Sequence, residues 1–351
     1  MKKFLCMLFA AVMVLSLAAC GNQNTPAASG SGSASGNGQK GTPTYSLKLS
    51  HCMSTNFSYH KFAEKFAEIV SEKTNGDVEV VIYPASQLGG ERESCEAAQL
   101  GTLDIAITAA APLANFSSEF EVFNLPFLFE DREHAHKYLD SEYGDAKLAS
   151  LESAGLVGLA FGENEFFDWF TTFEATEPSD FQGKSIRCME NNCYMAYLSA
   201  IGANPVPMAW SEVPAGLTNG TIDGTCLTLP GTWDLGMYKG NYFIKGDVCY
   251  GAVPMVMSKL VYDSLPAEYQ EIMHSAAKEA AAYERQWITD NEESMLKEMQ
   301  DAGLTYIECD RDAFIDVVVD KVYGQLVGDT IKAEDITDIN SFRTTDPVYV
   351  P

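Results

Sequence analysis

Arg187 is a charged side chain in an apolar setting. It lies in residues 185–189, a short run that predicts a β-strand after the turn at residues 182–184. A buried guanidinium among apolar neighbours is costly when it is unpaired, so it needs a partner. That partner is either a carboxylate of the protein or a ligand, and the residues alone leave both open.

Asp168 is a second candidate, because it interrupts residues 161–172, a stretch dense in aromatic side chains. The stretch fits a buried strand whose polar residues face outward. It fits the wall of a pocket equally well.

Patterns that carry catalysis are missing from the sequence. The only histidine cluster, Glu133-His134-Ala135-His136, spaces its histidines two residues apart, so on a helix they do not face each other and a surface helix is favoured. No zinc-protease, nucleophile-elbow, P-loop or dinucleotide-binding motif is present. Asp and Glu number 49, so a pair of carboxylates chosen from them would have no specificity. We therefore expect a receptor and not an enzyme, with no catalytic residue, metal site or cofactor.

The cysteines do not form a disulfide framework. Of nine, Cys6 and Cys20 lie near the N-terminus. The other seven are Cys52, Cys95, Cys188, Cys193, Cys226, Cys249 and Cys309. Seven is odd, so complete pairing within one chain is impossible. Cys188 and Cys193 lack the spacing of a zinc site, and we expect packed or surface thiols.

Charge and length limit the class of protein. The chain has 351 residues, of which 46% are hydrophobic, so it can bury a core, and its length suggests two domains. Lys and Arg number 23 against 49 acidic residues, which gives a net charge of −26. Because nucleic-acid binding depends on clustered basic residues, we expect no nucleic-acid partner.

The N-terminus has the pattern of an export signal. Lys2 and Lys3 precede an apolar run at residues 4–19 that would span about 24 Å as a helix, too short to cross a bilayer. The run ends in Leu-Ala-Ala-Cys20, which resembles the bacterial lipobox, so residues 1–19 are predicted to be a lipoprotein signal peptide and Cys20 the lipidated residue. The alternative is an ordinary signal that leaves Cys20 free. Cleavage after residue 19 removes two lysines and no acid, which leaves a net charge of −28.

Residues 20–43 are predicted to be the lipidated cysteine followed by a flexible tether. From residue 21 onward they contain Gly, Ser, Asn, Thr, Ala, Gln, Lys and Pro and no large apolar side chain. A coil of this length spans about 25 Å, enough to hold a folded body near a membrane.

The body of the chain predicts α/β layers. An alternating strand at residues 45–50 precedes a helix whose apolar positions 62, 66, 69 and 70 share one face, and a second strand follows at residues 77–83. Strand, helix and strand form a right-handed crossover. Residues 266–302 contain no Gly and no Pro after the first residue, so they predict one helix of about 55 Å that braces more than one lobe.

Six segments, in order, resemble the DctP-type solute-binding proteins of TRAP transporters. They are Tyr-Pro-Ala-Ser-Gln-Leu-Gly-Gly at 83–90, Gln-Leu-Gly-Thr-Leu-Asp at 99–104, Leu-Pro-Phe-Leu-Phe at 125–129, Gly-Lys-Ser-Ile-Arg at 183–187, Pro-Val-Pro-Met at 205–208 and Gly-Thr-Ile-Asp-Gly at 220–224. The resemblance implies a two-lobe α/β fold of the periplasmic-binding-protein kind (class II type), with hinge strands and a long bracing helix. Lobe I would comprise residues 44–164 and about 253–292, and lobe II about 165–252 and 293–351.

The same resemblance implies a function. An extracytoplasmic protein of this family captures a small carboxylate in the cleft between its lobes and delivers it to TRAP membrane subunits. Presentation of the ligand to a sensor kinase is the alternative, and an exported enzyme on a bilobal scaffold is a third hypothesis from another class.

The resemblance also implies site residues. Arg187 matches the arginine that grips the ligand carboxylate, and its planar group can meet both oxygens. Trp210 matches an aromatic residue that packs on the ligand, and Cys52 and Ala109 match wall positions of the first lobe.

Three departures from the family pattern shape the expected ligand. Phe167 and Asp168 stand where many members have a second arginine, Leu227 replaces a pocket asparagine, and a histidine near the end of the following strand region is missing. These changes argue against a dicarboxylate and favour a monocarboxylate with an apolar or cationic remainder, such as an amino-acid-like zwitterion. Asp168 would hold an ammonium group, while Phe167, Trp169, Trp210 and Trp233 would line an apolar or cation-binding wall.

Overall fold

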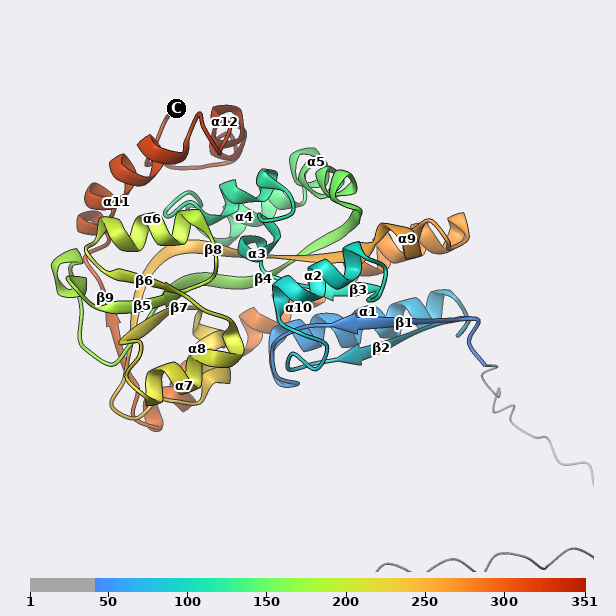
Figure 1. Ribbon diagram of the computed structural model, residues 1–351, viewed down its shortest axis with the longest axis horizontal. Coiled ribbons are helices and arrows are strands. Elements are labelled where there is room, and N and C mark those ends of the chain that lie inside the picture. The colour runs from blue at the N-terminus through green and yellow to red at the C-terminus, as the bar shows by residue number, and fades with distance from the viewer. Residues whose placement is uncertain (1–41) are drawn as a thin grey trace, which may run out of the picture. The chain divides into compact units, whose positions relative to one another are not determined.

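The computed structural model describes residues 42–351, which form a mixed β-sheet covered by helices (Figure 1). The predicted signal peptide, Cys20 and nearly all of the predicted tether lie outside the described residues. The strands follow the order β2-β1-β3-β8-β4-β7-β5-β6, and β9 pairs with β8. None of the helices in residues 42–351 is long and apolar enough to cross a membrane.

The strands are β1 (Tyr45–Ser50), β2 (Val78–Tyr83), β3 (Ile105–Ile107), β4 (Leu156–Thr171), β5 (Ser185–Cys188), β6 (Asn204–Pro207), β7 (Gly224–Leu227), β8 (Tyr242–Ser258) and β9 (Thr305–Glu308). The α-helices are α1 (Ser58–Lys73), α2 (Glu91–Gln99), α3 (Ala110–Leu113), α4 (Arg132–Leu139), α5 (Glu142–Ser150), α6 (Asn192–Ala200), α7 (Val213–Thr218), α8 (Leu229–Leu235), α9 (Lys259–Tyr262), α10 (Ala267–Asp301), α11 (Arg311–Leu326) and α12 (Ala333–Asn340). Short 3₁₀ helices complete the chain, among them η4 (Trp210–Glu212).

The strand, helix and strand predicted near the start of the body are β1, α1 and β2. β1 and β2 pair in parallel along their lengths. Between them α1 buries an apolar stripe that includes Phe62, Phe66 and Val70. The chain leaves the helix through Gly76, whose φ of +82° lies in the left-handed region that glycine adopts without strain. The predicted α/β layering is confirmed.

β4 and β8 connect the two halves of the sheet. They pair antiparallel from Leu156↔Ser258 to Thr171↔Tyr242. β3 lies beside β8 in the half that holds β1 and β2, and β7 lies beside β4 in the half that holds β5 and β6. The predicted lobe boundaries near residues 164 and 252 fall inside these two strands, and this division stays a prediction.

The ladder between β4 and β8 is irregular at its middle. Its register shifts between Glu163 and Phe166 and again between Phe167 and Trp169. Glu165 on β4 and Asp247 on β8 have φ values of +58° and +51°, which are unusual for residues other than glycine. Such bulges bend strands and redirect side chains. The crossing point therefore directs neighbouring residues of β4 to different surroundings.

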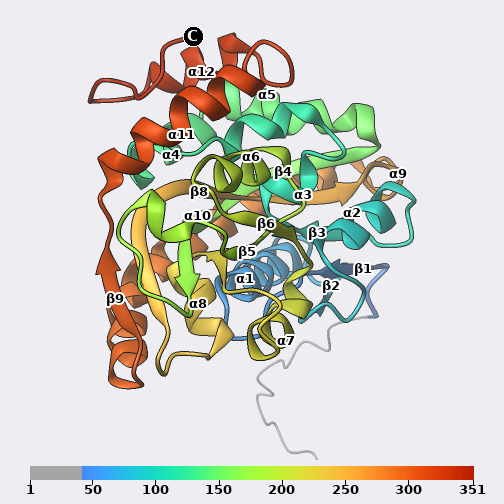
Figure 2. The same ribbon diagram turned by 60° about the vertical axis from the view of Figure 1, so that its left-hand side comes forward.

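Helices cover both sides of the half of the sheet that contains β5, β6 and β7. Figures 1 and 2 show α6 and α11 above these strands and α7 and α8 below them. Phe314 and Val318 on α11 pack in one core cluster with Tyr194 and Leu198 on α6. This half is therefore a layered α/β unit like the first.

α10 packs against both halves, as predicted from residues 266–302. The helix has 35 residues and a length of about 52 Å. Met273 and Ala280 belong to the core cluster around α1 and β1, whereas Met295 and Met299 belong to a cluster with residues of α7 and β8. A single rigid helix thus ties together two separate cores.

Two charged side chains anchor α10 to β4. Glu284 accepts a hydrogen bond from the backbone N–H of Glu163 at 3.0 Å, and Arg285 donates to the carbonyl of Phe161 at 2.8 Å. Arg285 also forms an ion pair with Asp140 at 2.7 Å. These contacts fix the helix to the strand at the crossing point.

The prediction that the His134–His136 segment is a plain surface helix is wrong for His134. The ring is 3% exposed, accepts from the N–H of Glu130 at 3.0 Å and contacts the carbonyl of Ile339 at 2.8 Å. His136, by contrast, contacts the carboxylate of Glu163. The two histidines point to different partners, as their spacing on the helix requires.

All seven cysteines in the described range are free thiols. Six are buried and Cys309 is partly exposed. Burial raises the pKa of Cys95 to about 12, so this thiol is not a reactive thiolate at neutral pH. The prediction of packed thiols is confirmed.

Glu284 should make the stability of the protein depend on pH. Burial and the charge of Glu163 raise its pKa from 4.5 to about 8. Between these values the folded protein binds a proton that the unfolded chain does not, so stability falls as pH rises through this window, by up to about 1.4 kcal/mol per pH unit. Glu284→Gln should flatten the decline in urea unfolding between pH 5.5 and 8.5.

A matched control lies on the same helix. Glu279 is exposed and pairs with Lys73, so Glu279→Gln makes the same chemical substitution on the same helix without touching the buried site. The control should follow the wild-type slope. If Glu284→Gln also follows it, the buried carboxyl does not carry the expected proton.

Candidate ligand-binding site

Two adjoining cavities lie between the halves of the sheet. The outer cavity has a volume of about 340 Å³ and the inner cavity about 30 Å³. Both are lined by Cys52, Glu91, Arg187, Met189 and Trp210. The first two of these come from the half with β1 and α2, and the last three from the half with β5 and β6. The site is therefore built from both halves.

Arg187 is fixed on β5, where its neighbours in register are Val206 on the edge strand β6 and Thr225 on β7. Its side chain is 4% exposed and its Nε donates to the carbonyl of Met208 at 2.9 Å. Within residues 42–351 no carboxylate lies within 4.0 Å of the guanidinium, and its terminal nitrogens have no hydrogen-bond acceptor. Burial lowers the pKa of Arg187, yet a guanidinium stays charged at any physiological pH. The guanidinium thus faces the cavity with no carboxylate at ion-pair distance, although the charge of Glu91 acts on it from within the site.

Trp210 closes the cavity on the side of the second half. It begins the 3₁₀ helix η4 and is partly buried. Its ring packs against the core around α1 and also against the core around α7 and β8. The indole therefore lies where the two halves meet and offers a flat apolar face to a ligand.

Glu91 and Asn164 add polar atoms to the site. Glu91 begins α2 and accepts a hydrogen bond from the N–H of Ala109 at 2.7 Å. Burial raises the pKa of Glu91, while the Ala109 N–H and the charge of Arg187 oppose this shift. Asn164 on β4 accepts from the hydroxyl of Thr228 at 3.0 Å, and its side chain also forms a hydrogen bond with Tyr59. The site thus contains the acceptor Glu91 and the amide of Asn164 in addition to Arg187.

The structure brings six of the nine predicted site residues together. The inner cavity is lined by Cys52, Ala109, Phe167, Arg187, Trp210 and Leu227. Sequence analysis missed Met53, Tyr59, Glu91, Asn164 and Met189, which line the same cavity. Glu91 directly follows the family-like segment at residues 83–90, and Asn164 lies in the aromatic stretch at residues 161–172. Both residues therefore lie next to or within patterns that are visible in the sequence.

Asp168 does not face the cavities, contrary to the prediction. Its Oδ1 accepts from the N–H of Gly246 at 2.9 Å, and its Oδ2 lies 3.7 Å from the ammonium of Lys245. Successive side chains of a strand point to opposite faces, so the direction of Phe167 into the inner cavity turns Asp168 away. Burial raises the pKa of Asp168 to about 7. Asp168 is therefore placed to hold the crossing strands and not a ligand ammonium.

Trp169 and Trp233 also lie away from the cavities. Trp169 is buried between Phe181 and Phe314, at ring distances of 5.1 and 4.6 Å. Trp233 on α8 donates its indole N–H to Glu298 of α10 at 3.0 Å. The first belongs to a hydrophobic core and the second to a contact between helices.

No metal centre is evident in the described part of the chain. Residues 42–351 contain no group of three or more His, Cys, Asp or Glu arranged to hold a metal ion. Arg187 is the buried positive group of the site, and Arg92 also lines the outer cavity.

The fold and the site define a binding protein: two α/β halves, joined by crossing strands, enclose a buried arginine that has no carboxylate at ion-pair distance. Comparison with known proteins gives the family. The model of the bacterial extracellular solute-binding proteins, family 7 (DctP), matches residues 49–325. The chain belongs to this family, and the predicted function as a TRAP solute-binding protein is confirmed.

Similar proteins that carry a name are also periplasmic solute-binding proteins. The chain is 31% identical to the 2,3-diketo-L-gulonate-binding periplasmic protein YiaO of Escherichia coli over 83% of its own length and 90% of that protein. Among solved structures, a TRAP periplasmic solute-binding protein from Bordetella bronchispeptica, with bound density interpreted as pantoate, superposes with a TM-score of 0.82 at 31% identity, covering 86% of this chain and all of the other. A Polaromonas protein bound to D-erythronate gives a TM-score of 0.82 at 29% identity with the same coverage. The predicted two-lobe fold is confirmed.

A pair of variants tests the structural role of Asp168. Asp168→Asn keeps an acceptor for the Gly246 N–H and should leave the free energy of unfolding close to that of the wild type at pH 7. Asp168→Leu removes the acceptor and should cost about 1 to 3 kcal/mol, because a buried N–H is left without a partner. Urea denaturation measures both. Equal stability of the two variants would show that the hydrogen bond to Gly246 contributes nothing.

Proposed function

We propose that this protein captures a small organic monocarboxylate with Arg187 and delivers it to the membrane subunits of a TRAP transporter. The observation that carries the proposal is the buried guanidinium, with no carboxylate at ion-pair distance, in a cavity between two lobes. A ligand carboxylate would supply that partner and accept two parallel hydrogen bonds from the terminal nitrogens. YiaO and the Bordetella and Polaromonas proteins support the proposal, since each is named with a hydroxylated or oxidised monocarboxylate.

The rest of the ligand extends from Arg187 toward the outer cavity. The inner cavity, at about 30 Å³, holds little more than one water molecule, whereas the outer cavity has about 340 Å³. Met189, Met208 and Trp210 offer an apolar wall for carbon atoms in the outer cavity. Glu91 offers an acceptor for a hydroxyl or ammonium group. With Asp168 outside the cavity, a polar remainder would meet Glu91, which lines both cavities, and other glutamates of the outer cavity, among them Glu93 and Glu212.

Capture requires the two lobes to separate and close. Across the outer cavity, Arg92 of α2 forms an ion pair with Glu190 at 2.7 Å, and Asn115 donates to the carbonyl of Glu190 at 3.4 Å. Glu190 follows β5, so these contacts join the two halves over the cavity that the ligand enters. The bulged middle of β4 and β8 is the place where hinge bending costs least, because ladder hydrogen bonds are already interrupted there.

The N-terminal segment supplies the membrane attachment in this proposal. Cys20 carries the lipid after removal of residues 1–19, and residues 21–43 tether the binding lobes outside the cytoplasm. The protein then presents its ligand and catalyses no reaction, so a bound carboxylate should be recovered chemically unchanged.

Substitution of Arg187 tests the ligand assignment. A thermal-shift screen of hydroxylated monocarboxylates, amino acids and dicarboxylates identifies the ligand, because a ligand at 100 times its Kd adds about 2.7 kcal/mol of stability. By calorimetry, Arg187→Ala should then weaken binding by roughly 2 to 5 kcal/mol, since it strands a desolvated carboxylate. The affinity of Arg187→Lys should lie between those of the wild type and Arg187→Ala, because lysine keeps the positive charge but lacks the planar guanidinium group. Unchanged affinity in a folded Arg187→Ala protein would exclude this role.

Substitution of Cys20 tests the anchor. The wild type, expressed in a bacterium that processes lipoproteins, should sediment with membranes and resist washing with high salt. In cells grown with labelled palmitate the wild type should carry the label and Cys20→Ser should not, because the lipid is attached through this thiol. Label on Cys20→Ser would contradict lipidation at this residue.

A further inference from the structure

A third cavity lies at the crossing of the hinge strands, apart from the ligand site. We call it the hinge pocket; it has a volume of about 340 Å³. Its lining includes Arg132, Glu165, Lys245, Asp247 and Glu292, with Phe166 as the aromatic member. It shares no lining residue with the inner or outer cavity. Its chemistry is therefore separate from the capture of the carboxylate.

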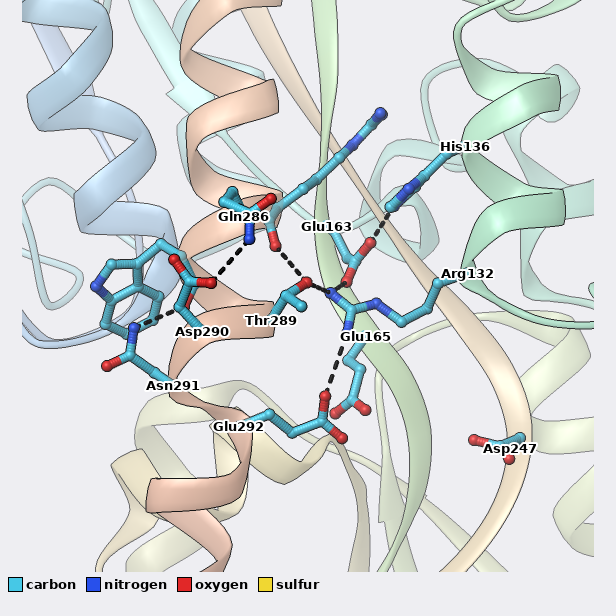
Figure 3. A network of polar contacts seen from close by, with 12 residues as sticks. Arg132, His136, Glu163, Glu165, Asp247, Gln286, Thr289, Asp290, Asn291 and Glu292 are labelled. Carbon is cyan, nitrogen blue, oxygen red and sulfur yellow. Dashed lines mark hydrogen bonds and ion pairs between the residues drawn. The ribbon is translucent and has the colours of Figure 1, made fainter.

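Arg132, one of the two cations of the hinge pocket, is directed at other partners. It pairs with Glu163 at 2.5 Å and Glu292 at 3.2 Å, and donates to Thr289 at 3.1 Å (Figure 3). Glu163 also contacts His136 and accepts from Tyr250 at 3.0 Å. These contacts compensate the charges of Glu163 and Glu292.

Lys245, the other cation, is shared among three carboxylates. Its Nζ lies 2.7 Å from Asp247, 3.6 Å from Glu165 and 3.7 Å from Asp168. One ammonium thus faces three acids, two of which are almost completely buried. Buried carboxylates need a counter-charge or a proton. The cluster lacks positive charge.

Glu165 is the carboxylate of this cluster that has an oxygen atom without a partner. The residue is 2% exposed and lines the hinge pocket, and its Oε2 has no hydrogen-bond partner. Figure 3 shows its carboxylate pointing toward that of Glu292. Burial, with the charges of Glu292 and Asp168, raises its pKa to about 8, against the attraction of Lys245 and Arg132. The backbone holds this unpaired acid at a φ of +58°, a conformation that needs support from the surrounding structure.

We propose that the hinge pocket binds a hydrogen-bonding organic cation, a primary ammonium or a guanidinium group, with Glu165 as its buried acceptor. Such a group donates to the free Oε2 and supplies the positive charge that the cluster lacks. The ring of Phe166 offers an apolar contact for its carbon stem. A metal ion fits less well, because Ca²⁺ takes six to eight oxygen ligands and the ammonium of Lys245 already lies among the carboxylates.

Titration with butylammonium chloride at constant ionic strength tests the site directly. Isothermal calorimetry at pH 8.5, where Glu165 is ionised, should show saturable binding of one equivalent, and binding should weaken at pH 6.5. Choline chloride has the same charge and no N–H donor, so it should not bind. Equal binding of choline and butylammonium would reduce the effect to general attraction to an acidic protein and overturn the proposal. Displacement of butylammonium by micromolar Ca²⁺ would likewise overturn the assigned chemistry.

Matched variants separate the site from net charge. Glu165→Gln should weaken butylammonium binding about tenfold or more through loss of a charge-assisted hydrogen bond. Glu279→Gln changes the net charge equally on an exposed face and should bind as the wild type does. If Glu165→Gln does not fold, Asp247→Asn, on a partly exposed residue of the same pocket, replaces it with the same expected direction. Wild-type affinity in a folded pocket variant would refute the role of this cluster.

The affinity distinguishes two sources of the cation. A free metabolite has to bind at micromolar concentration to occupy the pocket, whereas one lysine or arginine side chain of a partner protein needs only the millimolar affinity of a single contact. Butylammonium and agmatine titrated side by side give this value for each group. Micromolar and millimolar affinity both support the pocket as a cation site. If neither butylammonium nor agmatine binds at concentrations up to 100 mM, the proposal is contradicted.

Discussion

The pairing of β4 with β8 is the constraint on which the rest of the structure depends. These strands are the only ones of the described sheet that touch both halves, so their geometry sets where the halves meet. Their bulged middle sends Asn164 and Phe167 to the ligand cavity, while Glu163 and Glu165 meet the charged network on α4, β8 and α10. Binding residues and hinge residues therefore alternate along one strand. A change of strand register would move both sets at once.

Local and global electrostatics act in opposite directions in this protein. A net charge of −26 repels a carboxylate at long range. At the short distances of the cavity the field of Arg187 dominates, because salt screens charges farther away than about 8 Å at physiological ionic strength. The acidic surface influences how fast an anion arrives, whereas the buried guanidinium determines whether it stays. The overall charge was therefore a poor guide to the ligand.

Features with a repeated or ordered pattern were predictable from the sequence. The period of apolar residues gave α1 and the full length of α10, and the ordered family segments pointed to Arg187 and Trp210. Single polar residues were not predictable, because Glu91 is one of 49 acids and carries no spacing signal. The direction of Asp168 depends on bulges that no residue pattern announced. His134 is buried by contact with Ile339, a partner 205 positions away in the chain.

Glu163 and Glu165 form an internal comparison of what burial does to an acid. Both lie on β4, and they are 0% and 2% exposed. Burial raises the pKa of both, but the hydrogen bond from His136 and the charge of Arg132 bring that of Glu163 below its usual value. Glu165, whose ion-pair partner Lys245 is 3.6 Å away, has a pKa of about 8. Since burial is nearly equal, the number of close donors decides the charge state of each residue, and a donor placed at the free oxygen of Glu165 would bring it toward the state of Glu163.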